Sequence, residues 1–455
     1  MFGFLALLSL GLLRLVWLGD TSFVNDEGQL FAAALKANAE GVWVDHGLQG
    51  SRGVVYGPFA IWFYQIALAW FHSPMAIAAL KTGVCTLGTA VGVTILLRTF
   101  SFLPFWAGAA VFLSPYYWLY ARDLWDNSFL IPLVALAAAG HFRFLQGPSL
   151  TRFAWLVLCG SFCFLTHLMV LPLLAAIAVQ GVWVQGRWLR KNFWGVLFIL
   201  VLAAVFVWPY VHYLATHPAT QASWLGPKFR SFVFSLLGAR VFTAMALEYF
   251  LGWAWYLELP APVGYFVAAA IGITALAVIS SFVGMRRAWQ ARGESGAPGQ
   301  LAGFLALALG FHCVLLTGTQ LVSHPHYYSG LWIVFFLLAA WGASGQWGRK
   351  LSGLYLGSLA VSLVAMVGLL HIQGGNRELH HGMSLRLQWE AAHLLACYPP
   401  EALGEDLREN SFVEPLRLLR ARAVCKGAPQ AGRPRIRYAF PDRRRDAHFV
   451  VEPAN

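Results

Sequence analysis

The sequence predicts an all-α polytopic membrane protein of about eleven transmembrane helices, with a small α/β tail at its C-terminal end. Of its 455 residues, 58% are apolar and only 11% are charged. Because soluble proteins carry about 25% charged residues, most of this surface is expected to face lipid. The chain also holds 20 Trp, 15 Tyr and 34 Phe, and Trp and Tyr in particular collect at membrane interfaces. In a membrane protein the placement of charge matters more than its sum, so the net charge of +12 does not indicate nucleic acid as a partner.

Apolar stretches of about the length of a membrane span divide the chain. The predicted spans are 2–19, 75–97, 104–120, 128–142, 153–166, 168–185, 193–213, 263–284, 301–318, 327–345 and 351–371. The first stretch lacks the basic segment and the cleavage site of a signal peptide, so we expect it to be a retained span. Arg14 lies in its outer half and is expected to snorkel or to face the bundle interior.

Two further apolar stretches, 54–72 and 232–257, are interrupted by Gly-Pro and by charged residues. If neither crosses and the N-terminus lies inside, most loop Lys and Arg fall on the cytoplasmic side, as the positive-inside rule requires. These cytoplasmic residues are Arg98, Arg143, Arg152, Arg187, Arg190, Lys191, Arg286, Arg287, Arg292, Arg349 and Lys350. We therefore expect both stretches to form interfacial helices in the outer loops 20–74 and 214–262.

With eleven crossings, the chain divides into a transmembrane module, 1–371, and an extracytoplasmic tail, 372–455. The tail opens with apolar residues at helical spacing and ends in two short β-like runs, RIRYAF and HFVVE. Cys397 and Cys425 lie in it, where an oxidising compartment would allow them to pair. The sequence leaves their pairing open.

Two acidic clusters fall on the same outer face in this topology. Asp26 and Glu27 begin a predicted helix, where carboxylates are stabilised by the helix N-terminus and stay ionised. Asp123 and Asp126 lie in the segment RDLWDNSF, after Arg122. Helix capping is the alternative role for each cluster. Carboxylates facing one cavity can divide the work of a general base and of a group that holds a metal or a substrate.

Basic, imidazole and phenol groups are also expected on this face, where they would bind a phosphate at the membrane surface. For each one, pairing with a lipid headgroup or within the bundle is the alternative. These candidates are Arg52, Tyr56, Arg122, His167, Lys228, Arg230, His324, His326 and Tyr327, and the acidic Asp123 beside Arg122 is assigned to the same substrate site. The four tail histidines, His371, His380, His381 and His393, lack ligand spacing and are expected at the surface.

The order of these features resembles the GT-C glycosyltransferases, and most of all family 39, which includes protein O-mannosyltransferases and the lipid A aminoarabinose transferase. The resemblance covers roughly residues 1–345: a first span, a long loop opening with Asp26 and Glu27, the segment YGPFAIWFYQIAL, and then RDLWDNSFL. Tyr56-Gly57-Pro58 stands where eukaryotic members have His-Pro-Pro. His326-Tyr327 stands where bacterial members often have Arg-Tyr.

The resemblance implies a hexosyl- or pentosyltransferase of a bacterial-type inner membrane. It would take sugar from a polyprenyl-phosphate carrier and pass it, with inversion, to a lipid, glycan or protein acceptor on the outer face. Asp26 is implied as the catalytic carboxylate with Glu27 beside it, Asp126 as the second acidic position, and Arg122 as the basic residue before it. Apart from a divalent cation that Asp26 and Asp126 would hold, no cofactor is indicated. Two other functions remain open: a transporter or flippase for a lipid-linked or anionic substrate, and a noncatalytic assembly subunit.

Overall fold

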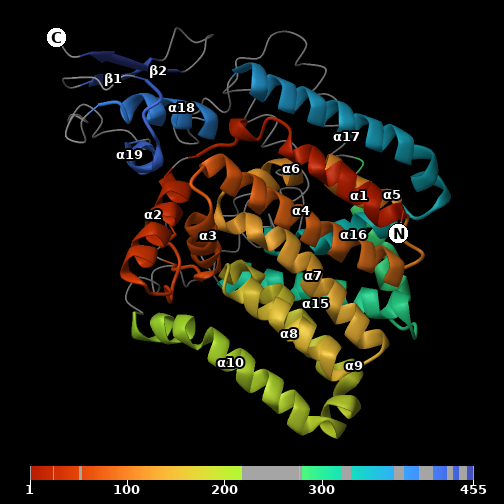
Figure 1. Ribbon diagram of the computed structural model, residues 1–455. Helices are drawn as coiled ribbons and strands as arrows, with labels where there is room; N and C mark the ends of the chain where they lie inside the picture. Colours follow the sequence, from red (N-terminus) through yellow and green to blue (C-terminus); the bar gives the residue numbers. More distant parts are fainter. Residues whose placement is uncertain are drawn as a thin grey trace.

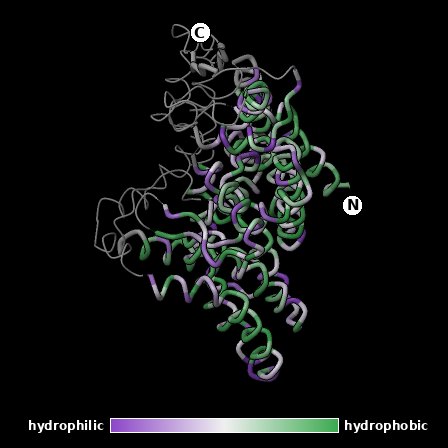
Figure 2. Tube along the Cα trace, turned by 60° about the vertical axis from the view of Figure 1, so that its left-hand side comes forward, coloured by the Kyte–Doolittle hydropathy of each residue, from purple (hydrophilic) through white to green (hydrophobic). Residues whose placement is uncertain are grey.

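The computed structural model describes residues 2–23, 25–50, 54–217, 276, 279–318, 329–373, 384–398, 413–427, 434–439 and 448–453. Within these ranges the chain is mostly helical, as predicted, and the only β-sheet with named strands is a small one in the tail (Figure 1). Hydrophobic residues run along most of the helical bundle (Figure 2). The predicted stretch 232–257 lies outside the described residues.

The centre of the bundle is built from α1 (Phe2–Leu12), α4 (Pro74–Thr99), α7 (Leu130–Gln146), α8 (Leu150–Phe164) and α9 (Leu171–Lys191), with α15 (Ala297–Gly318) and α16 (Trp332–Gly342) packed on α9 and α7. Helix α7 is buried on nearly all sides. Small residues allow α4 to approach it closely, since a Cβ on Gly92 would lie 2.7 Å from the carbonyl carbon of Ala135. Outside this centre lie α10 (Phe193–Thr216) and α17 (Gln346–Gln373).

Five helical segments are long and apolar enough to cross a membrane: Pro74–Thr99, Asp126–Gln146, Leu168–Lys191, Phe193–Thr216 and Ala297–Leu315. Five shorter apolar helical segments accompany them in the described residues. Two of the predicted spans are broken. The first ends as an α-helix at Leu12 and continues through 3-10 turns, Leu13–Leu15 and Leu18–Asp20, on either side of Trp17, which has a positive φ of 49°.

The second broken span, 104–120, divides into α5 (Trp106–Leu113) and α6 (Pro115–Arg122). Ser114 between them is extended, with φ −67° and ψ 124°, because the residue before a proline is disfavoured in the helical region. The stretch 263–284 falls only partly in the described residues, where 279–291 is helical.

The long loop after the first span contains two helices, α2 (Asn25–Glu40) and α3 (Phe59–Trp70). Helix α3 has 12 residues and is therefore about 18 Å long, well short of the ~30 Å hydrocarbon core. This length agrees with the expectation that 54–72 does not cross. Its inner face is fully buried at Ala60, Ile61 and Tyr64, so α3 is a core element of the bundle's end as well as an edge.

The tail has the predicted helix and β-runs, which form α18 (Leu385–Leu395) and the antiparallel pair β1 (Pro434–Ala439) and β2 (His448–Pro453). A further helix, α19 (Val413–Arg422), packs on α18, and a disulfide joins Cys397 to Cys425. Buried residues of α18 and α19 share one apolar core with α2 and α3. The tail helices are therefore integrated with the loop that carries Asp26.

The helices alternate in direction, which places the chain's polar segments at two opposite ends. Hydrogen bonds from Gln146 to the Thr99 carbonyl and from Gln185 to the Leu145 carbonyl join the ends of α4, α7 and α9 that lie near Arg98, Arg143 and Arg187. At the other end lie α2, α3, the C-terminus of α6 and the tail helices (Figure 1). We call this second end the acidic end, because it holds both predicted acidic clusters.

Candidate active site

The two acidic clusters meet at the acidic end, as the sequence predicts. Asp26 lies in the first turn of α2, and Asp126 begins the 3-10 turn Asp126–Phe129 that leads into α7. The Trp125 side chain donates a hydrogen bond to the Asp26 carboxylate, and the charge of Asp26 acts on the Asp126 carboxyl. Residues a hundred positions apart in sequence thus form one carboxylate pair.

Burial raises the pKa of the Asp26 carboxyl, and the Trp125 hydrogen bond opposes this only partly. The sequence analysis considered only the helix N-terminus, which favours the carboxylate. In the structure, desolvation by burial is the largest effect on this pKa. A half-buried carboxylate with a raised pKa is a stronger base than an ordinary surface aspartate.

The two remaining acids of the clusters differ in position. Glu27 is buried, and its charge acts on Lys81 and Tyr64 in the interior of the acidic end. Asp126 is also buried: its Oδ1 accepts a hydrogen bond from the Asn127 amide at 2.7 Å, while its Oδ2 has no partner among the described residues. This buried carboxylate oxygen, without a partner among the described residues, is an acceptor that a substrate hydroxyl or a cation could satisfy.

Arg122 points toward the exit of the first span. It is 2% exposed, donates to the Trp17 carbonyl, and its guanidinium carbon lies 3.8 Å from the centre of the Trp118 ring. Burial lowers the pKa of Arg122 to about 9, against the charges of Asp20 and Asp123, so the group stays cationic at neutral pH. Its Nε has no partner among the described residues.

Tyr56 and His167 are two of the predicted phosphate-binding residues, and the structure brings them together. Their rings stack at 4.1 Å. His167 Nδ1 accepts a hydrogen bond from the Met169 amide at 3.1 Å, and burial lowers the pKa of His167 to about 3. The imidazole is therefore neutral, with its proton on Nε2, and it can act toward a phosphate as a donor but not as a cation.

Gly57 makes this arrangement possible. A Cβ on Gly57 would lie 1.9 Å from the Leu165 carbonyl oxygen, the same oxygen that accepts the Phe59 amide at 3.0 Å. The loop 54–58 can approach the end of α8 only without a side chain at this position. The Gly-Pro of the sequence motif thus joins the start of α3 to the turn that carries His167.

Sequence reasoning missed Lys81, which is fully buried in α4. Its Nζ donates to the carbonyl oxygens of Ala121, at 3.0 Å, and of Asp123, and lies 5.3 Å from the Phe129 ring centre. These carbonyls lie at the C-terminus of α6, where Asp123 follows the last helical residue, Arg122. A lone lysine inside an apolar span was the available signal.

Asp20 was also missed. Asp20 is buried, its Oδ2 lies 2.9 Å from His371 Nδ1, and its Oδ1 lies 3.8 Å from Arg386 Nε. His371 also stacks on Trp17 at 4.0 Å. Its side chain is 40% exposed, as expected of a surface residue, and through these contacts His371 joins the end of α17 to the exit of the first span. Arg14 was expected either to snorkel or to face the bundle interior, and it faces the interior. Its guanidinium carbon lies 4.9 Å from the centre of the Phe112 ring.

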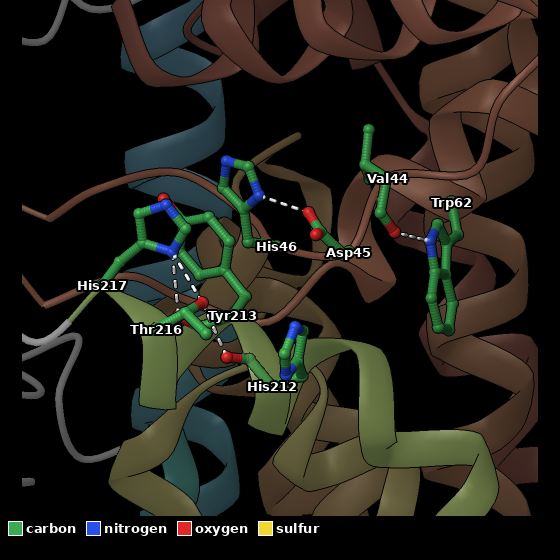
Figure 3. A network of polar contacts seen from close by, with 8 residues as sticks. All are labelled: Val44, Asp45, His46, Trp62, His212, Tyr213, Thr216 and His217. Carbon is green, nitrogen blue, oxygen red and sulfur yellow. Dashed lines mark hydrogen bonds and ion pairs between the residues drawn. The ribbon is translucent and has the colours of Figure 1, made fainter.

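A second polar network lies at the acidic end, between the loop after α2 and the C-terminus of α10 (Figure 3). His46 bonds to Asp45 at 2.6 Å and stacks on Tyr213 at 3.9 Å, and Tyr213 stacks in turn on His217 at 4.3 Å. In the described residues no group of three His, Cys, Asp or Glu is arranged to hold a metal ion. The network is therefore a contact between α10 and the α2 loop.

Six predicted phosphate-binding residues lie outside the described residues: Arg52, Lys228, Arg230, His324, His326 and Tyr327. Their places at the site remain predictions. The same holds for a divalent cation, for which Asp26 and Asp126 are two carboxylates to which the described residues add no third ligand.

Taken together, the described residues define a helical protein with membrane-length apolar helices and a partly buried carboxylate pair at one end. No protein-family model and no curated protein matches the chain. Two similar solved structures are of ArnT from Cupriavidus metallidurans, one bound to undecaprenyl phosphate and one in the apo state. They are 17% and 16% identical, each with a TM-score of 0.49, and the match covers 92% of this chain and 74% of that chain.

Proposed function

We propose that this protein is a membrane glycosyltransferase that moves a sugar from a polyprenyl-phosphate carrier to an acceptor on the outer face, with inversion. The observation that carries the proposal is the meeting of Asp26 and Asp126 at the end of an apolar helical bundle. A polyprenyl chain cannot leave the bilayer, so its reactive phosphate must be met at the membrane surface. Carboxylates at the end of a bundle are suited to that position.

In the proposed reaction, Asp26 is the general base. Its carboxylate accepts the proton of the acceptor hydroxyl while that oxygen attacks the anomeric carbon and the bond from this carbon to the phosphate oxygen breaks. The polyprenyl phosphate leaves with the bonding electron pair. The raised pKa of Asp26 improves proton transfer near neutral pH, provided that the group is ionised when the acceptor binds.

The neighbouring groups have electrostatic roles in this proposal. The Asp126 carboxylate, with its open Oδ2, eases the positive charge that develops on the sugar. Arg122 and His167 are the described candidates for donors to the departing phosphate. A divalent cation, where bound, would be held by Asp26 and Asp126 and would supply further positive charge there.

Buried ionisable residues in the spans are the observation that favours a transporter instead, because such residues often mark ion pathways. Arg14 and Lys81 are both fully buried. Lys81, however, donates to the carbonyl oxygens of Ala121 and Asp123, and a group held in this way fits a structural role better than a mobile gate. Arg14 donates to the Val111 carbonyl at 3.5 Å, while its Nε and Nη1 have no partner among the described residues.

The test compares binding and turnover in purified protein. Thermal stabilisation is recorded with polyprenyl phosphate, polyprenyl-phosphate sugars and nucleotide sugars, and sugar transfer from the stabilising donor is then measured. We expect selective stabilisation by the lipid carriers, and an Asp26→Asn variant that is stabilised equally but does not transfer sugar. Asp45→Asn, which changes an exposed acid at the same end, is the matched control and should keep full activity. Stabilisation by soluble anions alone would contradict the proposal and favour a transporter.

A further inference from the structure

The two tail helices, α18 and α19, are linked at their C-terminal ends, and we call them the tail helix pair. The disulfide between Cys397 and Cys425 joins the segment after α18 to the segment after α19. Arg420 donates to the Tyr398 carbonyl at 2.9 Å, and His393 Nδ1 lies 2.7 Å from the Val424 carbonyl oxygen. One covalent bond and two hydrogen bonds thus hold the C-terminal ends of the pair together.

The tail helix pair packs directly on the helix that carries Asp26. A Cβ on Gly28, two residues after Asp26, would lie 2.9 Å from Cγ of Pro415 in α19. Leu416 and Leu419 of α19 are almost fully buried, in the same core as Leu30 of α2. Figure 1 shows α19 beside one end of α2. The first turns of α2 are therefore held between α19 and the rest of the acidic end.

The segment that leads into α2 is held by α18. The Leu385 amide donates to the Thr21 carbonyl at 2.8 Å, and Gln388 Nε2 donates to the Phe23 carbonyl at 2.5 Å. An isolated antiparallel bridge joins Ser22 to Ser384. These bonds fix the backbone immediately before Asp26.

A third contact reaches α3. The Arg422 guanidinium donates to the carbonyl oxygens of Leu68, Phe71 and His72, at 3.3, 2.7 and 3.2 Å. These carbonyls include the unsatisfied acceptors at the C-terminus of α3, where a cation is favourable. Because α3 packs on α2, the tail helix pair holds both helices of the loop after the first span.

From these contacts we propose that the tail helix pair of α18 and α19, linked by the disulfide, is a clamp that sets the position of α2, and so of the Asp26 carboxylate. Gln388 and Arg422 are positioning residues in this clamp. Activity at Asp26 then depends on an oxidised Cys397–Cys425 pair, which connects the site to the redox state outside the membrane. The effect on sugar transfer, but not the effect on α2 itself, rests on the proposed function.

Hydrogen exchange of the full-length protein in detergent tests the clamp without any assumption about activity. Dithiothreitol supplies two electrons to the disulfide, each sulfur takes up a proton, and the reagent becomes its cyclic disulfide. On reduction we expect exchange in residues 25–31 to rise about tenfold, as local opening of α2 becomes easier. The Arg422→Gln variant, which keeps the disulfide, should raise exchange at the end of α3. Cys313→Ser, which removes a thiol in α15, should respond to dithiothreitol as the wild type does.

Two outcomes would overturn the clamp: exchange that rises in α18 and α19 alone, and exchange that is unchanged throughout a reduced protein. Sugar transfer gives a second readout. A loosened α2 lets water reach Asp26, which removes part of the burial that raises its pKa. Reduction should therefore lower kcat and shift the acid limb of the pH profile to lower pH. A general loss of folded protein would lower the rate without shifting the limb. If α2 loosens but the oxidised protein transfers no sugar from any lipid donor, the clamp stands and the proposed function fails.

Discussion

Replacing Gly57 with alanine tests the joint between the Gly-Pro motif and the His167 turn. The added Cβ would lie 1.9 Å from the oxygen, 2.2 Å from the carbonyl carbon and 2.6 Å from the Cα of Leu165. All three atoms are backbone, so the loop and the end of α8 must separate by more than 1 Å, by comparison with an ordinary contact of about 3.5 Å.

The cost has three parts. Overpacking a tight site costs about 1–3 kcal/mol. The Phe59 amide bond to the Leu165 carbonyl, 3.0 Å long, contributes about 1 kcal/mol. Separating the stacked rings of Tyr56 and His167 removes roughly 0.5–1.5 kcal/mol. We therefore expect Gly57→Ala to lower the free energy of unfolding by about 3–5 kcal/mol.

Denaturation in detergent measures this change, with Gly83→Ala as the matched control. Gly83 lies within α4, and a Cβ added there would have nothing within 4 Å, so alanine should be neutral or stabilise by up to about 1 kcal/mol. A Gly57→Ala protein as stable as the control would refute the packing argument. A second readout is binding of the lipid carrier, which should weaken because Tyr56 and His167 no longer share one surface.

Three other predictions follow from single groups. Lys81→Met leaves the carbonyls that close α6 without their donor and should cost about 2–4 kcal/mol in chemical denaturation, whereas a loss below about 0.5 kcal/mol would show that Lys81 is not a structural residue. Tyr210→Phe removes a 2.8 Å bond to the buried Val55 carbonyl and should cost about 1–2 kcal/mol; an unchanged unfolding midpoint would contradict this. Because burial raises the pKa of Asp26, the folded state binds its proton more tightly than the unfolded state, and stability should fall as pH rises from the ordinary aspartate value through the raised one. Asp26→Asn should remove that slope, and an identical slope in the variant would show that another group causes it.

Much of the fold followed from the sequence because its signals are local. Apolar length predicted α4, α7, α9, α10 and α15. The helix in the short Gly-Pro-led stretch has 12 residues, which agrees with its predicted interfacial position, and that position stays a prediction. The breaks at Trp17 and at Ser114 were not predicted, because hydropathy does not register backbone dihedrals. The proline at 115 was a visible signal for the second break.

The candidate site was only partly predictable, for a different reason. The predicted topology placed Asp26 and Asp126 on one face, and the structure brings them together. The rise in the pKa of Asp26 was not predicted, since burial depends on the tertiary packing, which no local pattern reveals. Lys81 and Asp20 were missed because their partners are backbone carbonyls or residues up to 366 positions away.

The length of helix α10 has a consequence for the acidic end. Its 24 residues make it about 36 Å long, more than the ~30 Å hydrocarbon core, and most of its surface is exposed. Such a helix relieves hydrophobic mismatch by tilting, and a thicker bilayer brings it upright. Its end carries Tyr213, which stacks on His46 in the loop after α2 and on His217 (Figure 3). A change in the tilt of α10 would therefore act on the loop after α2 through the contact between Tyr213 and His46.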